Sequence, residues 1–238
     1  YIDNLNNIYP EHYIYLTSDR EEILATCPEK LTFVYEVVDT NIMTVLPSTR
    51  VSYLNTEPLN IHSRLHSVMS VLNTYPEMEY YDYSKSNIQI LIDTGKYTNT
   101  KITYLPYKCS ENELNSLISL NKNTKKEFDF GILKTSGGVV TERRGKIVDF
   151  LKKHNFTVNI IGGWNDDRDT EFAKCNIILN IHGNLDTTIS HIFEHIRCDR
   201  LLDSGFNILS EESVNLHPSF IDNYPNLQLI HYDEFFNI

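Results

Sequence analysis

Two histidines and a glutamate occur within five residues of each other in the stretch HIFEH, at residues 191–195 of the 238-residue chain. On a helix, His191 and His195 would lie one turn apart and could hold a zinc ion, with Glu194 as the base beside it. A zinc protease of this type needs a third ligand from a later helix, and only residues 196–238 follow. The motif has only three fixed positions, so it favours the protease weakly and leaves room for another use of Glu194.

A second group of residues that could bind a ligand is basic. Arg143, Arg144 and Lys146 stand where a helix is expected to begin, after the stretch GILKTSGG. Positive charges at this end of a helix oppose the helix dipole unless they serve an anion. The pattern therefore indicates a diphosphate site at Arg143 and Arg144, and the alternative is a basic turn exposed to solvent.

Glu57 is the candidate catalytic carboxylate. It follows the strand-like run VSYLN and precedes Pro58, so it is expected at the end of a strand. There it could take a proton from an acceptor molecule, or it could simply close a turn. The acids of NDDRD, at residues 165–169, could suggest a metal site, but their position before a helix is typical of capping residues.

Alternating strand-like and helix-like segments must position these residues. Apolar or β-rich runs predict strands at 31–38, 51–55, 78–83, 101–107, 128–133, 156–161, 176–183, 206–210 and 227–232. Helical periodicity and capping signals predict helices at 61–75, 84–92, 110–120, 141–154, 169–175 and 191–204, with Ser84 and Ser110 as N-caps and Gly205 closing the last. This alternation predicts an α/β protein with parallel sheets.

The polar, basic segment at 121–128 lacks periodicity and is the best linker in the chain. It predicts two Rossmann-like halves, a domain at 1–122 on the acceptor side and a nucleotide-binding domain at 123–238, facing each other across a cleft. Ligands of open α/β sheets bind at the carboxyl ends of strands. The residues that follow each predicted strand are therefore the candidate site residues.

The stretch from Cys175 to Ser213 reads strand, loop, helix, glycine, strand, and it resembles the C-terminal half of a GT-B glycosyltransferase. The helix FEHIRCDRLLDSG resembles that of spore-maturation-type and giant-virus glycosyltransferase-like proteins. The similarity extends over about 190 residues, from Val51 onward. It implies transfer of a sugar from a nucleotide-sugar donor to an acceptor that the sequence does not identify.

The resemblance also implies roles for individual residues. Glu194 matches the glutamate that accepts hydrogen bonds from both ribose hydroxyls. Arg197 could order Glu194 or touch a phosphate, and the alternative for both residues is a solvated pair at i+3 on the helix surface. The diphosphate would lie against the loop and the helix N-terminus after the preceding strand, which places these residues in the donor site: His182, Gly183, Thr188, Ile189 and Ser190. No metal and no cofactor are expected, because helix dipole and basic side chains can neutralise the leaving diphosphate. The alternative from another class is a non-catalytic protein that binds a nucleotide or a sugar with the same fold.

Composition narrows the partners. The net charge is −11, from 32 acidic and 21 basic residues, which argues against general binding to nucleic acid or to anionic membranes. No apolar run approaches the ~20 residues of a membrane-spanning helix. Four scattered cysteines without a C-x-x-C pair favour free thiols in a reducing compartment, so we expect a cytoplasmic protein.

Overall fold

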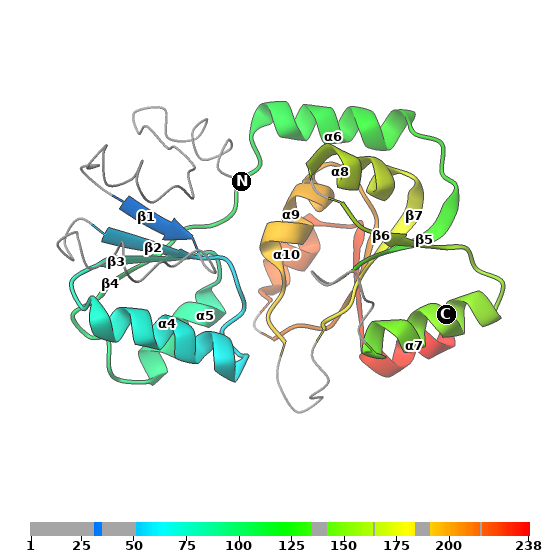
Figure 1. Ribbon diagram of the computed structural model, residues 1–238. Coiled ribbons are helices and arrows are strands. Elements are labelled where there is room, and N and C mark those ends of the chain that lie inside the picture. Colours follow the sequence, from blue (N-terminus) through cyan, green and yellow to red (C-terminus); the bar gives the residue numbers. More distant parts are fainter. Residues whose placement is uncertain (1–30, 35–50, 135–141, 164, 184–190, 215) are drawn as a thin grey trace. The chain divides into compact units, whose positions relative to one another are not determined.

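The computed structural model describes residues 31–34, 51–134, 142–163, 165–183, 191–214 and 216–238 (Figure 1). The chain divides into two compact units. The first comprises Tyr1–Lys108 with Glu194–Ile196, and the second comprises Cys109–Phe193 with Arg197–Ile238. Each unit contains a parallel sheet whose strands alternate with helices, so the predicted α/β class and its Rossmann-like character are confirmed.

The first unit contains a four-stranded parallel sheet in the order β1-β2-β3-β4. Its elements are β1 (Leu31–Val34), β2 (Val51–Asn55), α4 (His62–Thr74), β3 (Glu79–Asp82), α5 (Lys85–Asp93) and β4 (Lys101–Tyr104). Right-handed crossovers between strands added in chain order place their helices on one face of the sheet, and α4 and α5 lie on the same face (Figure 1). The core between the sheet and these helices contains Val68 and Leu72 of α4. It also contains Tyr53 and Tyr80, whose rings are stacked with their centroids 5.9 Å apart.

The second unit contains a five-stranded parallel sheet in the order β6-β5-β7-β8-β9. Its strands are β5 (Phe128–Leu133), β6 (Val158–Ile161), β7 (Cys175–Asn180), β8 (Ile208–Glu211) and β9 (Leu227–Ile230). Its helices are α6 (Glu111–Asn123), α7 (Glu142–Lys153), α8 (Asn165–Ala173), α9 (His195–Asp203), α10 (Pro218–Asn223) and the 3₁₀ helix η2 (Tyr232–Asn237). After β5 the chain adds β6 on one side and then β7 on the other. The sheet is therefore doubly wound, with its topological switch point between β5 and β7.

Helices cover both faces of this second sheet (Figure 1). On one face, α6, α8 and α9 contribute Leu117, Phe172 and Leu201 to an apolar core. On the other face, α7 contributes Ile147 and η2 contributes Phe235 to a separate core. The central strands β5 and β7 contribute apolar side chains to both cores, as expected of a parallel sheet with helices on both faces.

Local signals placed several helix ends correctly. The side chains of Ser84 and Ser110 accept hydrogen bonds from the backbone amides of Asn87 and Glu113, as predicted for N-caps. Gly205 ends α9 with φ at 78°, a conformation that favours glycine. The amide of Gly205 donates to Leu202 O and that of Phe206 donates to Leu201 O, which is the Schellman pattern.

The start of α9 differs from the prediction. The helix was expected from residue 191, but it begins at His195. The preceding chain is held differently, because Ile192 forms a parallel bridge with Val214 and the amide of Val214 donates to His191 O at 2.7 Å. The short helix α10 was not predicted, although Pro218 in its first turn after the N-cap His217 is a typical start signal.

The division between the units lies before α6, whereas the sequence favoured a boundary between residues 122 and 123, at the end of that helix. The reason is packing. Leu117 and Leu120 of α6 join the core of the second unit, so the helix belongs to it. The polar segment after α6 then connects two elements of the same unit.

Among the residues that the structure describes, no helix is long and apolar enough to cross a membrane. Cys109, Cys175 and Cys198 carry reduced thiols, as the sequence predicts for these three cysteines.

Candidate functional site

A ligand site is expected at the switch point of the second sheet, because doubly wound sheets bind ligands at the carboxyl ends of the strands there. The strands on its two sides, β5 and β7, end at Leu133 and Asn180. The segments at 135–141 and 184–190, which follow these strands, lie outside the described residues. Three of the predicted donor-site residues, Thr188, Ile189 and Ser190, belong to the second of these segments.

Arg144 connects the carboxyl ends of the two switch-point strands. Its side chain is only 5% exposed. Its Nε donates to Ile181 O at 2.8 Å and its Nη1 donates to Leu133 O at 3.3 Å. Arg144 therefore satisfies backbone carbonyls at the edge where a ligand is expected.

Arg143 forms a buried ion pair with Glu211, the last residue of β8. Both of its Nη atoms donate to the Glu211 carboxylate, and its guanidinium lies over the Tyr232 ring at 3.6 Å. The Arg143 Nε is buried and has no hydrogen-bond partner among the described residues. The alternative interpretation, that Arg143 and Arg144 lie in a basic turn exposed to solvent, is therefore wrong. The unfavourable position of Arg143 near a helix start is offset by the buried carboxylate.

Two histidines pack beside this ion pair. The rings of His182 and His191 stack with their centroids 4.3 Å apart. The backbone amide of His182 donates to Glu211 Oε2 at 3.2 Å, and Nε2 of His191 lies 3.9 Å from Glu211 Oε1. Residues 182 and 191 come just before and just after the segment 184–190, so Glu211 contacts the chain on both sides of it.

His182 also lies 3.1 Å from the hydroxyl of Ser213, measured from Nε2 to Oγ. A serine beside a histidine could suggest a nucleophile and its base. However, burial lowers the pKa of His182 to about 3, and the neighbouring His191 contributes to this shift. An imidazole that resists protonation is a poor general base near neutral pH. His182 is suited instead to a neutral hydrogen bond with a ligand or with Ser213.

Glu194 and Arg197 lie at the start of α9. Glu194 immediately precedes the helix, instead of standing within it, and is half-buried. Nη1 of Arg197 donates at 3.2 Å to Oδ1 of Asn180, the last residue of β7. Arg197 therefore contacts the last residue of β7, and His182 and Gly183 follow that residue in the chain.

The zinc interpretation loses its geometric basis. His191 precedes α9 and His195 begins it, so the two histidines are not one helical turn apart. The described residues contain no group of three or more His, Cys, Asp or Glu side chains that could hold a metal ion. The possible metal motif at 165–169 has other roles: Asp166 and Asp167 lie in the first turn of α8, and Asp169 pairs with Arg200 of α9.

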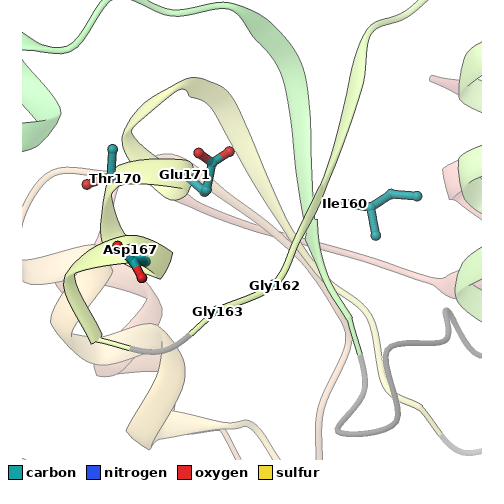
Figure 2. A pocket seen from close by; sticks show the side chains of 6 residues that line it. All are labelled: Ile160, Gly162, Gly163, Asp167, Thr170 and Glu171. Carbon is teal, nitrogen blue, oxygen red and sulfur yellow. The ribbon is translucent and has the colours of Figure 1, made fainter.

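A surface pocket of about 410 Å³ was not predicted from the sequence. It lies at the carboxyl end of β6, next to α8 (Figure 2). Its lining consists of Ile160, Gly162, Gly163, Asp167, Thr170 and Glu171. Among the described residues, the lining includes the carboxylates of Asp167 and Glu171, and Glu171 pairs with Lys174.

Glu57 lies at the carboxyl edge of the first sheet, just after β2, as predicted. Its carboxylate forms an ion pair with Arg64 of α4, and the two side chains are 30% and 31% exposed. Beneath it lies a buried carboxylate that sequence reasoning missed, Asp82 at the end of β3. Burial raises the pKa of Asp82 to about 6, against the effect of four hydrogen-bond donors. The available signal was an acid near the end of a predicted strand, two residues before the cap Ser84.

Comparison with known proteins finds relatives in a giant virus. Three uncharacterized proteins of Acanthamoeba polyphaga mimivirus are each 29% identical to this chain, over 217, 181 and 171 residues. These matches cover 90%, 75% and 71% of the chain. They cover 27%, 19% and 50% of the relatives, so the chain spans half of their length or less. No family profile and no solved structure matches it. The chain is therefore similar to giant-virus proteins, as the sequence resemblance implied.

Proposed function

We propose that this chain is a glycosyltransferase of the GT-B type that transfers a sugar from a nucleotide-sugar donor to an acceptor. The observation that carries the proposal is the hydrogen bond from Arg197 to Asn180 at the carboxyl end of β7, beside the switch point, where His182 and Gly183 follow the strand. Doubly wound sheets bind nucleotides at this place. Arg197 brings a positive charge suited to a phosphate, and Glu194 brings a carboxylate suited to a ribose diol.

The buried groups beneath this edge have a supporting role in the proposal. Arg143 and Arg144 are occupied with Glu211 and with backbone carbonyls. We therefore assign them to holding the edge in shape and assign the phosphate contacts to Arg197 and to backbone amides. A site whose side chains are fixed in advance binds its ligand with less loss of conformational entropy.

Calorimetry with uridine, guanosine and adenosine diphosphates tests the donor site. We expect at least one of them to bind, and we expect Glu194→Ala to weaken that binding by about 1.5–3 kcal/mol, the usual value for hydrogen bonds to a charged group. Glu212→Ala provides a matched control, because Glu212 is an exposed glutamate after β8. If none of the three diphosphates binds, the proposal is wrong. If Glu194→Ala binds as tightly as the wild type, Glu194 does not contact the ribose.

The alternative function is binding of a nucleotide or a nucleotide sugar without turnover. The two differ in one measurement, the release of nucleoside diphosphate from a nucleotide sugar when water is the only acceptor. Slow release by the wild type would support the transferase. Tight binding with no release from any sugar of the matching nucleotide would favour the binding protein.

A further inference from the structure

Asp82 is a fully buried carboxylate at the carboxyl end of β3. Its Oδ1 accepts hydrogen bonds from the Ser84 amide at 2.8 Å and from Asn87 Nδ2 at 2.9 Å. Its Oδ2 accepts from Asn55 Nδ2 at 2.8 Å and from the Tyr80 hydroxyl at 2.6 Å. Each oxygen therefore accepts two hydrogen bonds, as a buried carboxylate requires.

Two of these donors also hold the chain on both sides of Glu57. The amide group of Asn55 donates to Glu57 O at 2.7 Å, and its oxygen accepts from the Glu57 amide at 3.2 Å. Asn87 donates to the same Glu57 O at 3.0 Å and accepts from the Leu59 amide at 2.8 Å. Asn55 and Asn87 are both 0% exposed. The side-chain NH₂ group of each donates one hydrogen bond to Asp82 and one to Glu57 O, so Asp82 supports the orientation in which each amide holds Glu57.

This arrangement joins a buried carboxylate to a solvent-accessible one. The peptide groups of Glu57 are fixed from below, while its carboxylate is half-exposed beside Arg64. The Glu57 backbone forms three hydrogen bonds with the buried side chains of Asn55 and Asn87. The Glu57 carboxylate can therefore move only by rotation about its own χ angles. Precise placement of this kind is characteristic of functional carboxylates.

We propose that Asp82 is a positioning residue that acts through Asn55 and Asn87 to hold Glu57 in place. The role assigned to Glu57 rests on the proposed function. In that function Glu57 is the acceptor-side base, which takes a proton from the acceptor hydroxyl.

Asp82→Asn tests this with almost no change in side-chain shape. One acceptor oxygen becomes an NH₂ group, which must then face donors. The Tyr80 hydroxyl can rotate to accept a hydrogen bond from the new NH₂ group. Asn55 can accept one only if its side-chain amide flips, so that its oxygen faces residue 82. That would break both of its hydrogen bonds to Glu57. Facing the other way, the NH₂ group would oppose Asn87 in the same manner. In either case one of the two anchors of Glu57 is lost.

Native-state hydrogen exchange of the full chain gives a readout that does not depend on activity. In Asp82→Asn we expect the amides of Glu57 or Leu59 to exchange at least about tenfold faster relative to the other slow amides of the unit. Tyr80→Phe is the matched control, because it removes one bond to Asp82 and leaves Asn55 and Asn87 in place. Asn55→Ala, which keeps the buried charge, should expose the Glu57 amide and leave the Leu59 amide protected by Asn87.

These experiments separate positioning from simple stabilisation. If all slow amides in Asp82→Asn and in Asn55→Ala exchange faster by the same factor, Asp82 only stabilises the fold and the proposal is wrong. If the Glu57 and Leu59 amides keep their protection, it is wrong as well.

Turnover tests the catalytic part. Release of diphosphate from a nucleotide sugar should fall at least about tenfold in kcat for Asp82→Asn, with the donor KM unchanged, since its donor-binding residues are untouched. Local loss of protection with unchanged kcat would overturn the assignment to catalysis. If the wild type releases no diphosphate, the proposed function fails, and hydrogen exchange still decides whether Asp82 holds Glu57.

Discussion

Arg143 and Glu211 are 68 residues apart in the sequence and form a buried ion pair in the fold. Each residue type is an obvious candidate for ligand binding, and neither reveals its partner. The pair determines what the neighbouring residues can do, because Glu211 also accepts from the backbone amide of His182. At this edge of the sheet, a single carboxylate connects α7, the chain after β7 and the end of β8.

His182 gives a prediction about acid sensitivity. Burial lowers its pKa to about 3, whereas in the unfolded chain it is near 6.5. Below pH 6.5 the unfolded chain therefore binds a proton that the folded protein does not, so the stability due to neutral His182 is present above pH 6.5 and is lost as pH falls. Between pH 6.5 and 5 this group should lower the free energy of unfolding by about 2 kcal/mol.

Urea unfolding at pH 7 and pH 5 checks this. The loss of stability on going to pH 5 should be about 2 kcal/mol smaller in His182→Asn than in the wild type. His66→Asn, at an exposed position on α4, controls for the general effect of removing an imidazole. An equal pH effect in His182→Asn and in the wild type would show that His182 is solvated.

At the scale of elements, β5 is the central strand on which the second unit depends. It pairs with β6 on one side and with β7 on the other, and its residues contact the cores on both faces. Gly131 lies in the middle of this strand. A Cβ placed there would be 2.7 Å from Cys175 Sγ and 2.8 Å from Ile161 Cδ1. A close approach of neighbouring side chains, and not an unusual backbone conformation, requires glycine at this position.

Two glycine-to-alanine substitutions should therefore have opposite effects. Gly131→Ala overfills a packed core and should lower the free energy of unfolding by about 1–3 kcal/mol. Gly145 lies inside α7, where an added Cβ would meet no other atom within 4 Å, so Gly145→Ala should raise it by about 0.5–1 kcal/mol through helix propensity. Chemical denaturation of both variants beside the wild type checks the signs. Equal destabilisation by both would contradict the packing argument at Gly131.

At the scale of the whole molecule, the division into units determines which part of the chain can carry the donor site. Of the proposed donor residues, His182, Gly183 and Arg197 belong to the second unit, and Glu194 is grouped with the first. That unit begins with α6, whose Leu117 and Leu120 contribute to its core. Glu113 of the same helix also pairs with Arg200 of α9.

Two fragments test this division. Residues 109–238 should fold and bind the same nucleoside diphosphate as the full chain. Residues 123–238, which follow the boundary favoured by the sequence, lack α6 and should be less stable by several kcal/mol, at about 1.5–3 kcal/mol for each buried leucine. Circular dichroism melting of the two fragments measures the difference. Similar melting temperatures would mean that α6 is dispensable for the second unit.

The sequence by itself determined the class of the fold and many of its local features. Periodicity and capping depend on residues within a few positions of each other, which is why β2 and β5 have the predicted bounds and why Ser84, Ser110 and Gly205 act at helix ends as predicted. The same local rules missed the true start of α9, because a bridge to Val214 holds the residues before it.

Only the tertiary structure decided which polar residues are buried and what they contact. From the sequence, Arg143 and Arg144 could either form a phosphate site or lie in a solvated turn. The fold buries both against partners that are distant in the sequence. Asp82 received no role until β2, β3 and α5 brought Asn55 and Asn87 around it. The physical reason is that a charge is buried only where the fold gathers enough hydrogen-bonding partners, and these come from segments that sequence spacing does not relate.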